Sequence, residues 1–184
     1  MHKKTLLLVW FVVFYSGLHA QKGNNSISMN AEFAIPGFQK ENGFGFYAKG
    51  FYGIGKSGQI TVSLGFALFH SSDSVSDMEK GKTSKNLIPV LFGYKQNIGS
   101  FFIEPRIGLG QLGGRWQLYG TGDFVLESVF ALMGGISAGY GIKRFSFGIN
   151  FLAAHGVDAG DWGNKYFHYT SMFIGYDLFS NRRH

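Results

Sequence analysis

Histidines that stand close to hydroxyl or carboxylate side chains are the residues of this chain best suited to chemistry. In His168-Tyr169-Thr170 an imidazole and a hydroxyl are two residues apart, and Asp158 and Asp161 precede them. An acyl-transfer site needs a nucleophile beside an imidazole that a third group orients, and this segment is the nearest approach to one. Threonine substitutes poorly for serine in such a site, so we predict no catalytic residue.

Two other clusters combine a histidine with aspartates and could coordinate a cation. They are His70 with Asp73 and Asp77, and His155 with Asp158 and Asp161. Polar loop composition explains both clusters without a metal. The chain has no cysteine, which excludes thiolate ligands and disulfides. We predict neither a metal nor a cofactor.

The overall composition is typical of a sheet protein. The 184 residues suffice for one domain and include 28 Gly, 20 Phe and 9 Tyr, with only 15% charged residues. Helical domains do not tolerate so much glycine, and disordered chains lack the aromatic residues. The formal net charge is +6, but the basic residues are scattered rather than gathered in a stripe. We therefore expect no nucleic-acid partner.

The N-terminal residues have the three-part layout of a secretory signal peptide. Lys3 and Lys4 precede an apolar run from Leu6 to Tyr15, and small residues follow up to Ala20. The rival interpretation is a membrane anchor, but the apolar run is shorter than the roughly 20 residues that a spanning helix needs. We predict cleavage after Ala20, which leaves residues 21–184 as the mature domain.

Apolar residues alternate with small or polar ones through most of the remaining chain, which is the pattern of β-strands with two different faces. Between Gln59 and Phe69, for example, every second residue from Ile60 to Leu68 is large and apolar. Short turns and longer polar loops separate the segments alternately, as in an outer-membrane barrel. The eight predicted strands are Ser26 to Ile35, Phe44 to Ile54, Gln59 to Phe69, Leu87 to Gln96, Phe101 to Gln111, Ser128 to Tyr140, Arg144 to Ala154 and Tyr166 to Phe179.

The two strand faces favour a membrane barrel over a soluble barrel or a sandwich. The face opposite the apolar one carries small residues such as Gly135, Ser137 and Gly139, which suit the inside of a narrow barrel better than a solvated exterior. Aromatic residues of the apolar face recur where the strands meet the short turns, as in an interfacial girdle. This predicted periplasmic girdle consists of Tyr52, Tyr94, Phe101, Tyr140, Phe145 and Tyr176.

Charged residues of both signs fall on the inward face by alternation. They are Glu32, Lys49, Lys95, Glu104, Arg106 and Asp177. Buried charges must be paired or solvated, and an eight-stranded interior is just wide enough for side chains. We favour a salt-bridge network that fills the barrel over the lining of a channel. The aromatic residues Trp116, Tyr119, Phe124 and Trp162 are expected in the extracellular loops, where they could contact a ligand, a partner or lipopolysaccharide.

The segment from Leu87 to Leu112 resembles the porin-family proteins of Bacteroidota that carry an outer-membrane β-barrel domain. The resemblance lies in Ile88-Pro89-Val90-Leu91-Phe92-Gly93-Tyr94-Lys95 and in Phe102-Ile103-Glu104-Pro105-Arg106-Ile107-Gly108-Leu109-Gly110. It implies an eight-stranded barrel but no activity. Pro105 would face lipid without a ladder donor, which predicts a bulge or irregular pairing. The run from Met172 to Phe179 resembles the C-terminal strand that the barrel insertion machinery reads.

These patterns predict an all-β, eight-stranded antiparallel up-and-down transmembrane barrel in the cell outer membrane of a Gram-negative bacterium. Its expected role is structural or adhesive, with a plugged or very narrow lumen, and its expected partners are outer-membrane lipid or lipopolysaccharide and the insertion machinery. Porin-like transport of small solutes or hydrophobic molecules is the alternative. A lipid-modifying enzyme is the third possibility. The sequence identifies no extracellular partner.

Overall fold

The chain folds into eight long β-strands in a computed structural model, which describes residues 25–35, 42–54, 57–71, 83–117, 124–156 and 166–180. The strand count and order agree with the alternation of the sequence. The strands are β1 (Ser26–Ile35), β2 (Asn42–Ile54), β3 (Gly58–Ser71), β4 (Thr83–Ile98), β5 (Phe101–Gln117), β6 (Phe124–Ile142), β7 (Phe145–Gly156) and β8 (Tyr166–Ser180). Among the described residues, no helix is long and apolar enough to cross a bilayer.

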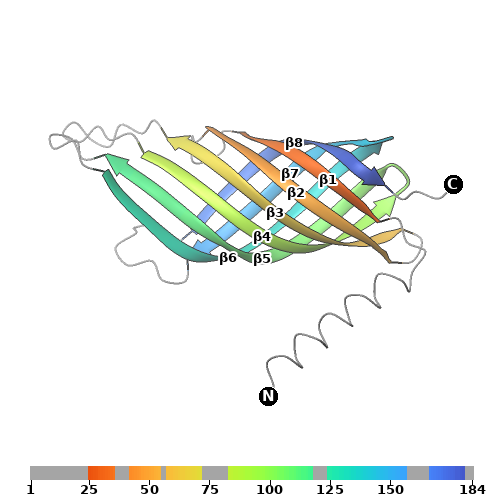
Figure 1. The fold of residues 1–184 in the computed structure, drawn as a ribbon, viewed down its shortest axis with the longest axis horizontal. Helices are drawn as coiled ribbons and strands as arrows, with labels where there is room; N and C mark the ends of the chain where they lie inside the picture. Colours follow the sequence, from red (N-terminus) through yellow and green to blue (C-terminus); the bar gives the residue numbers. More distant parts are fainter. Residues whose placement is uncertain are drawn as a thin grey trace, which may run out of the picture.

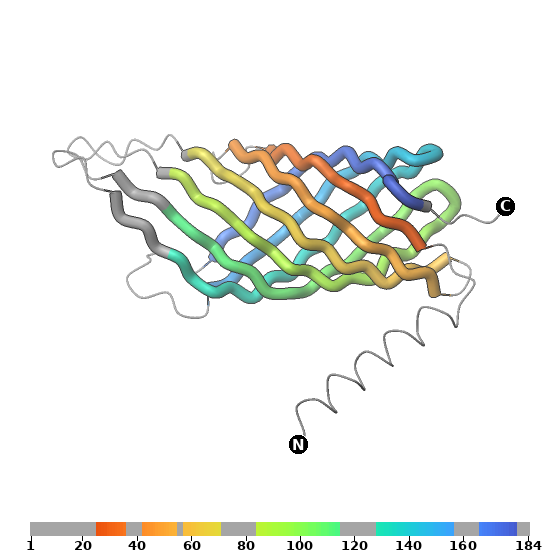
Figure 2. The backbone as a smooth tube through the Cα atoms, in the orientation of Figure 1, coloured from red at the N-terminus to blue at the C-terminus, as the bar shows by residue number. Residues whose placement is uncertain are grey.

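Each strand pairs with the next in antiparallel fashion, and β8 pairs with β1 to close the barrel (Figure 1). The strands run at a clear tilt to the barrel axis, as the backbone trace shows (Figure 2). Every strand of the barrel therefore pairs with a neighbour on both sides, so that most backbone groups of the wall are satisfied within the sheet, as a membrane-spanning sheet requires. At the short-turn end Gly99 and Lys143 adopt positive φ angles of 63° and 55° in the tight turns.

Three strands extend at least four residues further toward the long loops than the sequence predicted. β4 starts at Thr83 instead of Leu87, β5 ends at Gln117 instead of Gln111, and β6 starts at Phe124 instead of Ser128. The pairing of β5 with β6 continues through these extensions to Gln117↔Phe124. The predicted strands were too short because the strict alternation ends where neither face has to meet lipid, whereas the backbone pairing continues.

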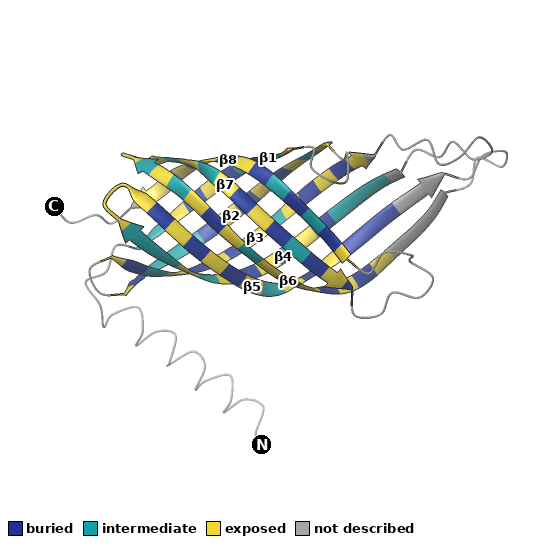
Figure 3. Cartoon of the chain, turned by 180° about the vertical axis from the view of Figure 1, so that it is seen from behind, coloured by how far each residue is buried: buried dark blue, intermediate teal, exposed yellow. Residues whose placement is uncertain are grey.

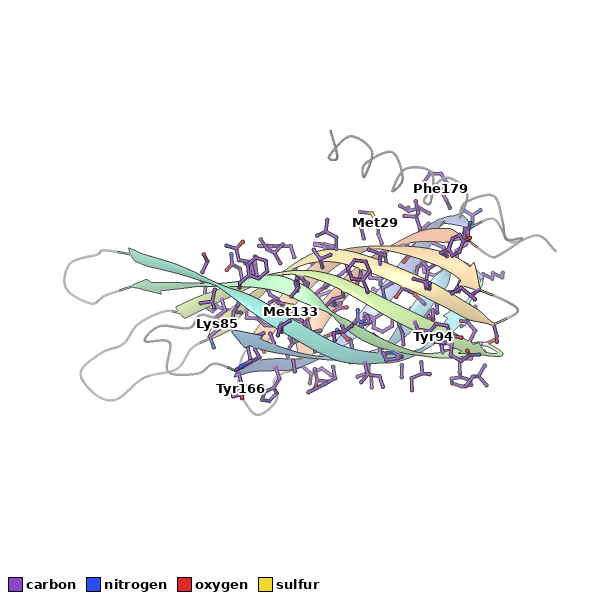
Figure 4. All side chains as sticks on the ribbon, turned by 90° about the horizontal axis from the view of Figure 1, so that it is seen from below. Met29, Lys85, Tyr94, Met133, Tyr166 and Phe179 are labelled. Atoms are coloured by element: carbon purple, nitrogen blue, oxygen red, sulfur yellow. The ribbon has the colours of Figure 1, made fainter. Side chains whose placement is uncertain are left out.

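The two faces of the wall differ as the alternation predicts (Figure 3). Large apolar residues on the outer face remain exposed, as Leu64 does with 55% of its surface, while their sequence neighbours are buried in the lumen. Met29 and Phe179 illustrate how apolar side chains project outward from the wall (Figure 4). A soluble protein rarely exposes so continuous an apolar surface, so this exterior is that of a barrel that spans a membrane.

Inward-facing glycines lie directly across from bulky inward side chains on the neighbouring strand. Tyr47 is paired with Gly65, and a Cβ atom built on Gly65 would lie 2.1 Å from the Tyr47 ring. Phe102 and Gly139 form the same kind of pair, with a Cβ atom 2.7 Å from the ring. A narrow barrel needs such pairs because two bulky side chains cannot share one level of the lumen, and this accounts for much of the glycine content.

The pairing of β4 with β5 is irregular beside Pro105. The paired residues run to Gly93↔Arg106 and resume, in the same register, at Gln96↔Ile103. Proline has no N–H to donate to the ladder. The predicted irregularity is therefore a gap in the pairing rather than a bulge.

Candidate functional site

The buried polar and charged residues of the lumen form the largest candidate site in the described part of the chain. We call seven of them the lumen belt, because they lie at mid-height in the barrel and come from six of its strands. They are Glu32, Lys49, Thr61, Glu104, Arg106, Asn150 and Ser171, each no more than 5% exposed. Alternation places the side chains of all seven inward, and small inward-facing residues on the neighbouring strands leave room for them.

Lys49 of β2 and Glu104 of β5 form a salt bridge across the lumen. Their Nζ and Oε2 atoms are 2.9 Å apart, and the glutamate is completely buried. The second carboxylate oxygen of Glu104 accepts a hydrogen bond of 2.7 Å from the Thr61 hydroxyl. Both oxygens of this carboxylate thus have partners, as a buried charge requires.

The other two belt charges, Glu32 and Arg106, are joined through Asn150. The Arg106 guanidinium donates to Oδ1 of Asn150, and Nδ2 of Asn150 donates to Glu32 over 3.0 Å. Ser171 donates a second bond of 3.0 Å to the same Glu32 oxygen. Asn150 therefore links a cation to an anion through a neutral amide. Nε of Arg106 has no hydrogen-bond partner among the described residues.

Lys95 and Asp177 also lie on the inward face. Both are partly exposed toward the short-turn end. The Lys95 ammonium lies over two aromatic rings, 4.1 Å from the centroid of Phe102 and 4.8 Å from that of Phe51. Four of the six predicted lumen charges thus meet in the belt, and the other two lie nearer the short-turn end.

An apolar layer fills the lumen on the long-loop side of the belt. Phe69 is central to it, with ring centroids 4.9 Å from both Phe167 and Tyr169. Tyr169 also shares a hydrogen bond of 2.7 Å with Tyr47, where the apolar layer meets the belt. The buried residues of the layer are Ala67, Phe69, Leu87, Leu91, Leu112, Ala131, Met133, Leu152, Ala154, Phe167 and Tyr169. A polar belt and an apolar layer therefore occupy the lumen in series.

Sequence reasoning identified the belt charges but missed the neutral residues that connect them. Thr61, Asn150 and Ser171 are buried and hydrogen-bonded to the charged groups. Their inward position follows from the same alternation that selected the charges, so a neutral polar residue at an inward position near mid-strand was the available signal.

The predicted periplasmic girdle lies on the outer face near the short-turn ends. Its rings pair across strands, with centroids 4.9 Å apart for Phe101 and Tyr140 and 5.0 Å apart for Phe145 and Tyr176. Tyr94 is exposed and donates to Gln96, while Tyr52 is only partly exposed.

The structure describes two of the four aromatic residues expected in the extracellular loops. Trp116 and Phe124 belong to the extended ends of β5 and β6, so their assignment to loops is wrong. The reason is the continued pairing of these two strands beyond the predicted ends. Tyr119 and Trp162 lie outside the described residues.

The structure describes only part of the candidate acyl-transfer site. His168 and Thr170 face outward, whereas Tyr169 between them is buried in the lumen. Asp73, Asp77, Asp158 and Asp161 lie outside the described residues. Within the described ranges, no three acidic or histidine side chains are grouped so that they could hold a metal ion.

No protein-family model matches the chain, and no curated protein matches it in sequence. Solved structures do match its fold. Ail, the attachment invasion locus protein of Yersinia pestis, is 17% identical with a TM-score of 0.57, over 85% of this chain and 99% of that chain. A major outer membrane protein of Thermus thermophilus is 12% identical with a TM-score of 0.64, over 84% and 99%. The outer membrane enzyme PagL is 12% identical with a TM-score of 0.51, over 82% and 99%. The fold of this chain is thus that of the eight-stranded β-barrels of bacterial outer membranes.

Proposed function

We propose that the protein is an integral outer-membrane barrel with a structural or adhesive role and a lumen that does not conduct. The observation that carries this proposal is the occupied lumen, in which the belt charges are bound to one another or through Asn150 beside a buried apolar layer. A permeation path needs polar groups that water or a solute can reach, and the belt groups are buried. The barrel then serves as a scaffold for the surface that its long-loop end presents outside the cell.

The strand extensions support the adhesive part of the proposal. β4, β5 and β6 carry the sheet beyond the level at which the pairing of β7 with β6 ends, at Ala131↔Gly156 (Figure 1). A sheet that continues past the membrane can hold loops rigidly above the surface. Ail, named as an attachment and invasion protein, has the same fold, although at 17% identity the likeness alone does not transfer a role.

Single-channel recording in planar bilayers tests the proposal. The protein is first shown to be folded by its faster migration in an unboiled gel sample and the loss of that shift on heating. The folded protein is expected to give no steady current. A stable, salt-dependent current would contradict the plugged lumen and favour the alternative, porin-like transport of small solutes.

Enzymatic activity is not part of this proposal. PagL shows that the fold can carry an enzyme, but His168 here is followed two residues later by a threonine, a poor nucleophile for acyl transfer. Modification of lipid A by the purified protein would contradict the assignment.

The origin and targeting of the chain are also proposed from its sequence. Residues 1–20 would be removed as a signal peptide, so that the mature protein starts at Gln21, and the run from Met172 to Phe179 would be read by the insertion machinery. The likeness of residues 88–110 to Bacteroidota barrels is consistent with this route. The intact mass of the protein extracted from outer membranes tests the cleavage site, because a mass that includes Lys3 and Lys4 would contradict it.

A further inference from the structure

The outer face of β8 turns polar closer to the membrane centre than the face of its neighbour β7. On β7 the lipid-facing residues stay apolar from Phe145 to Ala153 and first become polar at His155. On β8 the apolar run upward from Tyr176 ends at Met172, and Thr170 and His168 follow. Since Phe145 and Tyr176 pair with each other, the two runs start at the same level, and the one on β8 is shorter.

His168 therefore lies at the depth of the outer leaflet. β-strands rise about 3.3 Å per residue, and at a tilt of about 40° the stretch from Tyr176 to Tyr166 covers roughly 25 Å of membrane normal. That is about the height of the apolar band of such barrels. Tyr166 thus reaches the outer interface, and His168 lies just below it. Ionisable side chains at membrane depth are costly and mark functional sites.

His155, Tyr166 and His168 form one group on this face, which we call the outer notch. His155 and Tyr166 are register partners, and their rings stack with centroids 4.5 Å apart. His168 occupies the next outward level of β8, opposite Ala153, with its ring centroid 6.3 Å from that of Phe151. Tyr166 is 70% exposed and projects from the outer surface of the barrel (Figure 4).

Small residues form the barrel surface beside the notch, so that few side-chain atoms project from it. Ala153 pairs with His168 on one side and with Gly134 on the other. A Cβ atom built on Gly134 would meet nothing within 4 Å. The row Gly134–Ala153–His168 thus leaves room for an acyl chain against the barrel wall, with the polar groups at its upper end.

The chemistry of the notch favours an anion. Its imidazole N–H groups and the Tyr166 hydroxyl are hydrogen-bond donors, and the outward-facing residues in the described parts of β6, β7 and β8 include no carboxylate. Phosphate groups of lipids lie at the interface level that the notch occupies. We propose that the outer notch binds the phosphorylated head group of an outer-leaflet lipid, with an acyl chain along Gly134 and Ala153. This inference rests on the membrane location proposed above.

Native mass spectrometry of the protein released from phosphatidylcholine nanodiscs containing diphosphoryl lipid A tests the site. The wild-type protein is expected to retain lipid A, and the variant His155→Leu/His168→Leu to retain about tenfold less, because hydrogen bonds to a charged group contribute about 1.4 kcal/mol or more. Tyr166→Phe, which keeps the stacked ring and removes one donor, should have an intermediate effect. His70→Leu is the matched control, since His70 faces outward at the long-loop end of β3 on the opposite wall, and it should retain lipid A like the wild type.

Two results would overturn the inference. Equal retention by the wild type and His155→Leu/His168→Leu would exclude the notch as the binding site. Equal retention of dephosphorylated lipid A by the wild type would show that the phosphate is not recognised. The heat-dependent gel shift is measured on every variant, so that a failure of the membrane fold itself is recognised separately.

Discussion

The Lys49 ammonium and the Glu104 carboxylate meet across the lumen at 2.9 Å although they lie on β2 and β5, which are not neighbouring strands. Lys95 is on β4, which pairs with β5, and its ammonium lies over the rings of Phe51 and Phe102. The salt bridge therefore connects two strands that do not pair with each other, and its loss should destabilise the closed sheet beyond one strand pair.

Removing one partner of this pair should be far more harmful than removing both. Lys49→Met leaves the buried Glu104 charge without its cation, which should cost about 3–5 kcal/mol of unfolding free energy. The double variant Lys49→Met/Glu104→Gln keeps an acceptor for Thr61 and removes both charges, so it should recover part of that loss. Urea-induced unfolding in lipid bilayers, monitored by the gel shift, measures the two single variants and the double variant as a double-mutant cycle. Additive effects of the two substitutions would contradict a direct interaction.

Asn150 should matter as much as a charged residue, because it joins Arg106 to Glu32. Asn150→Leu has a similar volume but leaves both charges without this partner, and we expect a loss of about 3–5 kcal/mol. Leu152→Met, a volume-conserving change at a buried inward position of the same strand, should cost less than about 1.5 kcal/mol. If the two variants unfold at the same urea concentration, the linking role of Asn150 is wrong.

The sequence determines which residues enter the lumen but not which of them meet. Alternation with period two fixes the face of Glu32, Lys49, Glu104 and Arg106, because each β-strand turns successive side chains to opposite sides. Contact between Lys49 and Glu104 depends on the diameter of the closed barrel and on the stagger of its strands. Neither quantity can be read from a single strand, so the pairing and the role of Asn150 emerged only from the structure.

The strand ends toward the long loops were the least predictable part of the fold. Near the membrane centre, lipid on one side and a crowded lumen on the other force a strict alternation, as in Gln59 to Phe69. Beyond the membrane that constraint ends, and the extension of β6 to Phe124 depends on its pairing with β5. This pairing involves backbone groups, which leave little trace in the sequence.

Glycine at position 65 should be required because the Tyr47 ring lies against it. Gly65→Ala would place a Cβ atom 2.1 Å from that ring, so the ring must move away and lose its hydrogen bond of 2.7 Å to Tyr169. We expect a loss of about 1–3 kcal/mol. Gly134→Ala is the control, since a Cβ atom there meets nothing within 4 Å, and it should change stability by less than about 0.5 kcal/mol. Equal losses in both variants would show that the backbone flexibility of glycine, and not the space beside the Tyr47 ring, determines the loss of stability.

The outward apolar face should respond to charge according to its depth in the membrane. Leu64 lies near the middle of β3 and is 55% exposed, whereas Ile98 ends β4 at the short-turn side and is 67% exposed. In a bilayer, Leu64→Arg should cost about 2–4 kcal/mol and Ile98→Arg no more than about 1 kcal/mol. In a soluble barrel both changes would replace exposed apolar surface by charge, and neither would be destabilising to that extent. Urea unfolding of both variants in lipid vesicles distinguishes the cases, and equal small effects would contradict a membrane-spanning wall.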